Sequence, residues 1–184
     1  MKVPAKASGI LYILLAAFFF SLMTFFVKLS GDVPSMQKVF FRNIVAFVVA
    51  FVMLARSEEK FRVRRDSWGP LFLRCAFGTA GIVANFWAID RLALADSNIL
   101  NKMSPFFAIA MSYFILKERP NKVEWGSVVI ALIGAMFVIK PTAGIASLPA
   151  LVGLFSGFAA GTAYTYVRKL SNRGERGTVI VFMF

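Results

Sequence analysis

The ten residues SLMTFFVKLS at positions 21–30 return in part as TAYTYVRKLS at positions 162–171. At an offset of 141 positions, the identical pairs are Thr24 and Thr165, Lys28 and Lys169, Leu29 and Leu170, Ser30 and Ser171, and Phe41 and Phe182. Both copies end apolar runs, and the second copy lies five such runs further along the chain. Because an odd number of membrane crossings turns a segment upside down, the pattern predicts an inverted repeat, which is typical of secondary transporters.

The composition predicts an all-α polytopic membrane protein. Of the 184 residues, 59% are apolar and 21 are Phe, and the mean hydropathy is +0.72. A soluble domain is about 45–50% apolar, and here the excess is concentrated in long blocks. Since about 20 residues cross the hydrocarbon core, we predict six full spans and a partial seventh that begins near Thr178. The full spans are predicted at residues 10–27, 39–55, 71–89, 97–116, 125–139 and 150–167.

The distribution of charge between the loops predicts the orientation. Most basic residues outside the spans lie at the N-terminus, which contains Lys2, or in the second, fourth and sixth loops, as Arg62 and Arg64 do. The odd-numbered loops contain only Lys28, Lys38, Arg91 and Lys140. The positive-inside rule therefore predicts a cytoplasmic N-terminus, and we expect a multi-pass protein of the cell membrane. The first apolar run is longer than the core of a signal peptide, so we interpret it as a retained span.

Several classes of function are disfavoured by the composition. The chain has no His and a single Cys, Cys75, so we expect no metal, no cofactor and no internal disulfide. The net charge of +12 is explained by the loops that orient the chain, so we expect no nucleic-acid partner. The predicted partners are the lipid bilayer and a small-molecule substrate, and a homodimer is left open. No Asp or Glu lies deep within a predicted span, although proton-coupled carriers usually need one there.

Polar residues repeat on one face of the first and sixth predicted spans. Ser21, Thr24 and Lys28 have the spacing i, i+3, i+7 and so share a helix face. Polar groups within a membrane usually face a cavity or the interior of a bundle. The alternative is that the hydroxyls bond to their own helix and that the lysines extend to the interface. The predicted cavity residues here are Ser21, Thr24, Lys28, Thr162 and Thr165, with Lys169 as a gating or structural charge.

The fourth predicted span has the most specific polar face. Asn98, Asn101, Lys102 and Pro105 follow the spacing i, i+3, i+4, i+7. Pro105 has no N–H to donate to the carbonyl of Asn101, so that carbonyl is left for another partner. Interrupted spans indicate transport sites, and we predict that this face binds substrate. The alternative is a Pro kink that neighbouring helices satisfy, with Lys102 directed to the interface.

The third predicted span contributes two further candidates. Asn85 and Trp87 lie in its outer part and are predicted to face the same cavity, although Trp87 also fits an interfacial aromatic belt. Arg74 lies near the other end of this span, and we expect it to extend to the cytoplasm.

Charged residues near other span ends have structural interpretations. Arg42 has Asp32, Asp90 and Asp96 available on the outer side, so an ion-pair gate is left open. Glu118 is expected to pair with a Lys or Arg on the cytoplasmic side.

Small residues repeat along the sixth predicted span. Gly153, Gly157 and Gly161 form a small-xxx-small pattern that lets helix backbones approach closely. We interpret the pattern as helix packing; a sliding surface for a conformational change is the alternative.

Ordered motifs along the chain resemble the EamA-type branch of the drug/metabolite transporter superfamily. They are Arg42, NFWAI at 85–89, LALADS at 92–97, SPF at 104–106, LKERP at 116–120, Gly126, Gly134 and KP at 140–141. The resemblance implies ten spans in two inverted five-span repeats, cytoplasmic termini and a central cavity. Residues 8–141 would be the first repeat, and residues 148–184 the incomplete start of the second, so we expect a C-terminally truncated member. Such proteins export or exchange amino acids, other metabolites, nucleotide sugars or drugs.

The leading prediction is an integral membrane transporter of small metabolites, such as amino acids or related polar compounds. It would export or exchange them by alternating access. An enzyme is not expected, because a nucleophile motif, His and clustered carboxylates are absent from the sequence. The alternative is a truncated, non-transporting membrane remnant or interaction subunit.

Overall fold

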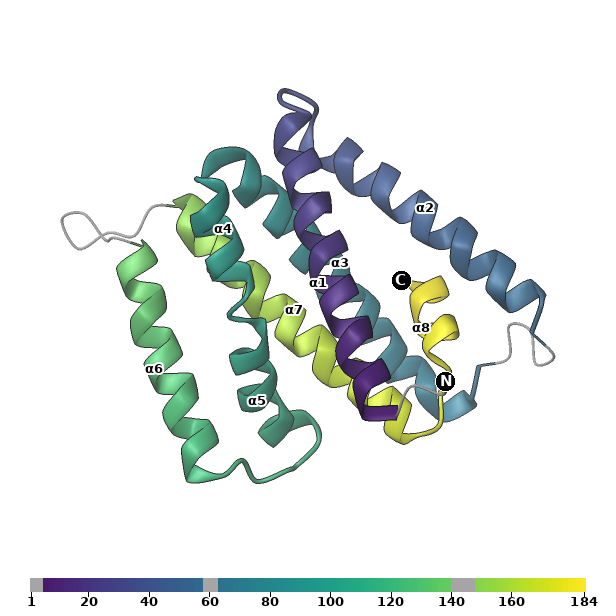
Figure 1. Ribbon diagram of the computed structural model, residues 1–184. Helices are drawn as coiled ribbons and strands as arrows, with labels where there is room; N and C mark the ends of the chain where they lie inside the picture. Colours follow the sequence, from purple (N-terminus) through teal and green to yellow (C-terminus); the bar gives the residue numbers. More distant parts are fainter. Residues whose placement is uncertain (1–4, 58–62, 140–147) are drawn as a thin grey trace.

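The computed structural model describes residues 5–57, 63–139 and 148–184, and every regular element in them is a helix. The predicted all-α class is therefore confirmed. Lys2, Arg62 and Lys140, which entered the prediction of orientation, lie outside the described residues. The elements in Figure 1 are α1 (Ala5–Leu29), α2 (Ser35–Ala55), the 3-10 turn η1 (Arg65–Ser67), α3 (Trp68–Arg91), α4 (Leu94–Asn101), α5 (Ser104–Ile115), α6 (Lys122–Ile139), α7 (Leu148–Asn172) and α8 (Gly177–Met183).

Among the described residues, four helical segments are long and apolar enough to cross a membrane, judged by length and composition. They are α1, α2, α3 together with η1, and α7, and they correspond to the first, second, third and sixth predicted spans. The fifth predicted span coincides with the 18 residues of α6, whereas the fourth is divided between α4 and α5. The count of six full spans and the two-repeat arrangement remain predictions.

Contacts between helix ends show that α1 and α7 run in opposite directions. Lys28, in the last turn of α1, donates to the carbonyl of Ile89 at the end of α3. Arg173, just after α7, donates to the carbonyl of Asp66 at the start of the same segment. The C-terminal ends of α1 and α7 thus lie at opposite ends of α3, as Figure 1 also shows. An inverted repeat requires this opposition.

The two ends of the bundle are named here after Lys28 and Lys169, which lie at opposite ends. We call the end that contains residues 28–35 and 89–94 the Lys28 end. The Lys169 end contains residues 56–57, 63–68, 115–122 and 168–177, where Lys169 donates to the carbonyl of Ile115 over 3.4 Å. Helices α4 and α5 together therefore run from one end to the other, in place of one continuous span.

The interruption between α4 and α5 follows from Pro105. Helix α4 ends at Asn101 and α5 begins at Ser104, which puts Pro105 at the second position of α5. A proline is tolerated in the first turn of a helix, where its missing N–H has no partner to lose. The predicted interruption of the fourth span is present: two turn residues, Lys102 and Met103, separate α4 from α5. Their N–H groups still donate to the carbonyls of Asn98 and Leu100, so the interruption has the form of a kink, which was the alternative.

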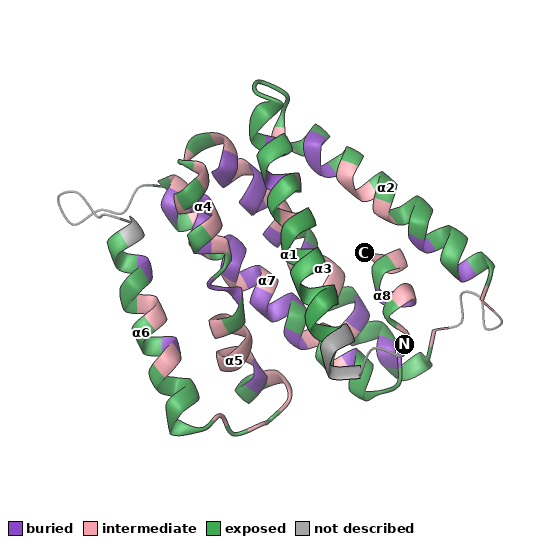
Figure 2. Cartoon of the chain, in the orientation of Figure 1, coloured by how far each residue is buried: buried purple, intermediate pink, exposed green. Residues whose placement is uncertain are grey.

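Helix α7 forms the centre of the packing, mainly against α3 and α5. Its glycine positions face the break: a Cβ on Gly157 would lie 2.5 Å from the carbonyl oxygen of Leu100, and one on Gly161 equally close to that of Ser104. The interpretation of the glycine pattern as helix packing is confirmed. Figure 2 shows that α1, α2 and α6 are largely exposed, and their exposed residues are mostly apolar, as in Phe40. Such surfaces suit contact with lipid chains.

Candidate functional site

A cavity of about 140 Å³ lies among α1, α2, α3, α4, α7 and the end of the chain after α8. Its polar lining comes from Arg42, Arg74, Asn85, Asn101 and Tyr164. The remaining lining is apolar or glycine, as expected for a small-molecule site that fixes a ligand with a few polar groups.

Asn85 projects from the buried face of α3 into this lining. Its side chain is almost fully enclosed, with the residue 5% exposed, and its Oδ1 atom has no hydrogen-bond partner in the part of the chain that the structure describes. An unpaired buried polar atom costs free energy, so such an atom in a native protein calls for an explanation. Asn85 is also one of the residues that line the cavity.

Arg74 departs from the expectation that it extends to the cytoplasm. Its guanidinium lies over the backbone of Gly78, one helical turn further along α3, where any larger side chain would collide with it. It also stacks on the ring of Phe184, with 4.0 Å between Cζ and the ring centroid. Its Nε and Nη1 atoms are buried and have no hydrogen-bond partner among the described residues. Because Gly78 has no side chain, the guanidinium of Arg74 can lie over its backbone and line the cavity.

Arg42 reaches the same cavity from α2. Its Nη1 atom donates to Oδ1 of its neighbour Asn43 over 2.8 Å. In the described part of the chain no carboxylate forms an ion pair with Arg42 or Arg74. The structure therefore contains no ion pair between Arg42 and the outer aspartates that the sequence left open.

Asn101 joins the cavity to the break between α4 and α5. Its Nδ2 atom donates to Oγ of Ser156 on α7 over 3.2 Å, and that hydroxyl donates in turn to the carbonyl of Gly153 over 2.6 Å. Asn101 is the last residue of α4, so these bonds fix the end of the interrupted span against α7.

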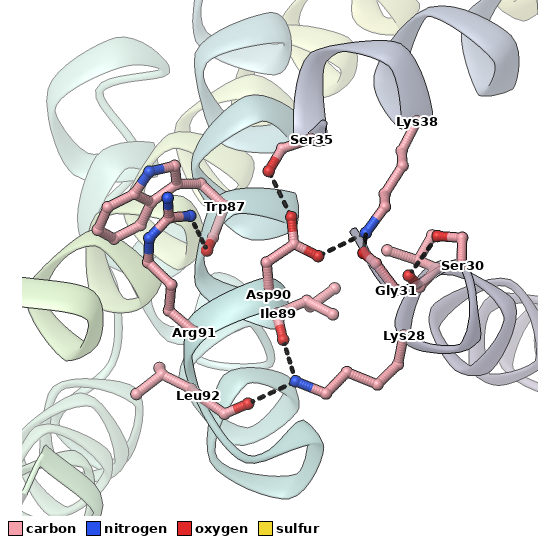
Figure 3. Close-up of polar contacts among 11 residues, drawn as sticks. Lys28, Ser30, Gly31, Ser35, Lys38, Trp87, Ile89, Asp90, Arg91 and Leu92 are labelled. Atoms are coloured by element: carbon pink, nitrogen blue, oxygen red, sulfur yellow. Dashed lines mark hydrogen bonds and ion pairs between the residues drawn. The ribbon is translucent and has the colours of Figure 1, made fainter. Parts of the chain in front are cut away.

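A separate polar cluster closes the Lys28 end (Figure 3). Lys38 donates to Oδ1 of Asp90 over 2.6 Å and to the carbonyl of Gly31 over 3.1 Å, while Ser35 donates to the other carboxylate oxygen. Lys28 donates to the carbonyls of Ile89 and Leu92. The cluster ties the turn between α1 and α2 to the end of α3. Sequence reasoning missed the ion pair of Lys38, because this residue was counted only as a loop charge.

Trp87 lies beside this cluster and not in the lining of the cavity. The guanidinium of Arg91 stacks on its ring, with 4.0 Å between Cζ and the ring centroid (Figure 3). Trp87 and Asp90 line an open hollow at the Lys28 end. This position also suits the interfacial alternative.

The predicted hydroxyl face is bonded mainly to its own helices. Thr24 donates to the carbonyl of Ser21, Thr162 to that of Phe158, and Thr165 to that of Gly161. Thr165 also reaches the carbonyl of Ala108 on α5 over 3.3 Å. Ser21 itself is exposed. The alternative that these hydroxyls satisfy their own helix carbonyls therefore describes the three threonines.

The remaining predicted residues of the fourth span lie outside the cavity lining. Asn98 is half-buried, and Lys102 is exposed with its Nζ atom 5.8 Å from the ring centroid of Phe20. Pro105 is exposed and lines an open groove that extends to the Lys169 end. In the same groove Glu118 forms the expected ion pair, with 3.0 Å between its Oε2 and Nη1 of Arg168. Of all the predicted site residues, the cavity gathers Arg42, Asn85 and Asn101.

Arg74 and Tyr164 also line the cavity but were missed as site residues. Tyr164 lies between the predicted Thr162 and Thr165 on a different face of the helix, so their spacing excluded it. For Arg74 a usable signal exists in the sequence, since Gly78 four residues later leaves space on the same face.

Comparisons with known proteins agree on one family of membrane transporters. Residues 7–140 match the EamA-like transporter family. A pseudopaline exporter of Pseudomonas aeruginosa (strain UCBPP-PA14) is 34% identical over 99% of this chain and 64% of its own length. A riboflavin transporter of Vibrio cholerae is 24% identical over 95% of this chain and 60% of its own length. Mouse solute carrier family 35 member G1 is 26% identical over 76% of this chain and 38% of its own length. The chain thus spans less than two thirds of these relatives, and no solved structure matches it.

Proposed function

Because the chain belongs to the EamA-like transporter family, we propose that it moves small polar metabolites, such as amino acids or related compounds, out of the cell or in exchange. Its relatives are transporters and not enzymes, and its apolar helices make it a multi-pass membrane protein. Residues 8–141 form the first five-span repeat in this proposal, and residues 148–184 contribute the start of the second.

The cavity among α1, α2, α3, α4 and α7 is the observation that carries the proposal. It is lined by Asn85 and Asn101, and Asn101 ends the first half of an interrupted helix, a feature that is typical of substrate sites in secondary transporters. Buried polar atoms without partners are costly in a membrane. A polar substrate that hydrogen-bonds to Oδ1 of Asn85, which has no partner among the described residues, would recover that cost, which supports a binding role for the cavity.

The arrangement of the loops supports a cytoplasmic N-terminus. Arg64 donates to the carbonyl of Arg173 over 2.8 Å, and Arg176 donates to Ser57 over 2.7 Å, so the basic second and sixth loops gather at the Lys169 end. The Lys28 end has the ion pair of Lys38 and fewer basic residues. The positive-inside rule then assigns the Lys169 end to the cytoplasmic side of the cell membrane.

Alternating access requires that the cavity open to each side in turn. The polar cluster at the Lys28 end joins α1, α2 and α3 outside the cavity and suits a contact that holds this side closed. The break between α4 and α5 supplies a position at which one segment can move against the other.

The test is export from cells that express the chain, measured by comparing metabolites in the medium with those from vector-only cells. We expect at least one small polar metabolite to accumulate, and Asn101→Ala to lower its export about tenfold, because one buried hydrogen-bonding group is worth about 1–3 kcal/mol. Asn172→Ala is the matched control, since Asn172 is exposed at the end of α7.

Membrane insertion of each variant is measured in parallel. Equal export by Asn101→Ala and the parent chain would remove the cavity assignment. An unchanged medium from cells with correctly inserted chain would argue against transport and for a non-transporting interaction subunit.

A further inference from the structure

The cavity adjoins the open groove, which measures about 550 Å³, lies between α5 and α7 and extends to the Lys169 end. On α7, Ala160 and Ala163 line the cavity, whereas Thr165 and Arg168 line the groove. Tyr164 lines both, and it is the one described residue that the two linings share. The side chain of Tyr164 therefore lies where the two spaces meet.

The wall opposite α7 changes from cavity to groove at the interruption between α4 and α5. Asn101, the last residue of α4, lines the cavity, and Pro105, the second residue of α5, lines the groove. Four residues separate the two, which corresponds to about 6 Å along a helix. On both walls the cavity thus ends within about one helical turn of the groove. The two spaces have the arrangement of one path that a side chain interrupts.

Tyr164 has the size and the freedom to act at this boundary. The residue is 55% exposed, and its hydroxyl has no hydrogen-bond partner in the part of the chain that the structure describes. Tyr166, two residues further along α7, stacks instead on Phe77, with 6.4 Å between the ring centroids. Exposed side chains change rotamer on the picosecond to nanosecond timescale. The ring of Tyr164 can therefore move without breaking a hydrogen bond to the described chain.

The far end of the groove is open to water. Glu118 and Arg168 line it there, and their side chains are 40% and 60% exposed. The hydroxyl residues Ser112 and Thr165 also belong to the lining. Polar and charged groups within a membrane protein usually face a bundle interior or a water-filled space. The groove is thus suited to polar solutes that enter from the Lys169 end.

We propose that the groove is the passage between the cavity and the Lys169 end, and that the ring of Tyr164 limits the size of the molecules that pass. The volume of the ring is the determinant, because the hydroxyl bonds to no described residue. The inference rests on the proposed function, since it makes the groove the cytoplasmic half of the transport path. Tyr164 then selects substrates by size before they reach Asn85 and Asn101.

The test is the rate at which a cysteine in the cavity reacts with a membrane-impermeant thiol reagent. Cys75→Ser removes the single native thiol, and Met23→Cys places a new one on α1 in the cavity lining. The reagent is 2-sulfonatoethyl methanethiosulfonate, whose negative charge suits a cavity lined by Arg42 and Arg74. Right-side-out and inside-out vesicles are compared. Asn172→Cys in the same Cys75→Ser background, exposed at the Lys169 end, identifies the vesicles that present this end and supplies the reference rate.

The expected rates depend on the volume of residue 164. In vesicles that present the Lys169 end, Tyr164→Ala should accelerate labelling of Met23→Cys about tenfold, which corresponds to a barrier lower by about 1.4 kcal/mol. Tyr164→Trp should slow labelling, and Tyr164→Phe should leave it unchanged. Tyr113→Ala is the matched control, because Tyr113 on α5 is 47% exposed and lies in neither lining, and it should react as the parent does.

Three results would overturn the inference. They are equal or absent labelling of the cavity cysteine in the parent, Tyr164→Ala and Tyr113→Ala chains, acceleration confined to vesicles that present the Lys28 end, and an effect of Tyr164→Phe as large as that of Tyr164→Ala. Labelling does not require transport, so the two proposals fail separately. Export together with unchanged labelling of Tyr164→Ala would remove this inference alone. The expected labelling without export by inserted chain would remove the transport proposal and leave a water-filled path that Tyr164 restricts.

Discussion

Replacing Gly161 with Ala tests how closely α7 approaches the break between α4 and α5. A Cβ at this position would lie 2.5 Å from the carbonyl oxygen of Ser104, 2.8 Å from Cβ of Phe107 and 2.9 Å from the backbone nitrogen of Ala108. Ordinary contact begins at 3.4 Å, so the helices must separate by about 0.9 Å, the difference from 2.5 Å. Two of the three atoms belong to the backbone, and no change of rotamer can move them.

The expected magnitude combines two opposing effects. Overpacking a tight contact costs about 1–3 kcal/mol, and this contact belongs at the upper end because three atoms are too close. Replacing a glycine within a helix recovers about 0.5–1 kcal/mol. We therefore expect Gly161→Ala to lower the free energy of unfolding by about 2 kcal/mol.

The measurement is reversible unfolding in mixed detergent micelles by titration with sodium dodecyl sulfate. Gly134→Ala is the matched control, because a Cβ on Gly134 of α6 would meet no atom within 4 Å. The control should be unchanged or more stable by up to about 1 kcal/mol. If Gly161→Ala proves as stable as Gly134→Ala, the close approach of α7 to α5 is wrong.

Two further predictions concern ion pairs and use the same unfolding assay. Asp90→Ala should destabilise the chain by about 3 kcal/mol, because the side chain of Lys38 is only 4% exposed and would lose its counter-ion. The double variant Lys38→Met, Asp90→Leu should recover most of that loss. An equal loss of stability in the single and double variants would contradict this explanation. Glu118→Gln should change stability by less than about 1 kcal/mol, since its pair with Arg168 has side chains 40% and 60% exposed; a loss above about 2 kcal/mol would show that this pair is coupled to the core.

Some features of this fold follow from local chemistry and were therefore predictable. The long apolar runs become helices because each backbone polar group in a membrane must be satisfied within the segment. Pro105 interrupts the fourth span because its ring nitrogen cannot donate. The glycines of α7 permit close packing because they have no side chain, and Gly157 lies against the backbone of Leu100.

Other features depend on which helix lies next to which, and spacing within one helix does not contain that information. Arg74 turns into the cavity because Gly78 leaves space and Phe184, distant in sequence, supplies a ring. Asp90 was one of three acidic residues available at its end, and only the packing of α2 against α3 selects Lys38 as its partner. Thr24 fits a polar face by its spacing, but its hydroxyl bonds to the carbonyl of Ser21 in its own helix.

The cavity and the close packing of α7 depend on each other through Asn101. This residue ends α4, lines the cavity and bonds to Ser156, one residue before Gly157. The carbonyl of Leu100 rests against Gly157, so the distance between the two backbones decides whether Asn101 can reach both the cavity and Ser156. The break that Pro105 imposes and the glycines that accept it therefore jointly place a polar side chain at the centre of an apolar bundle.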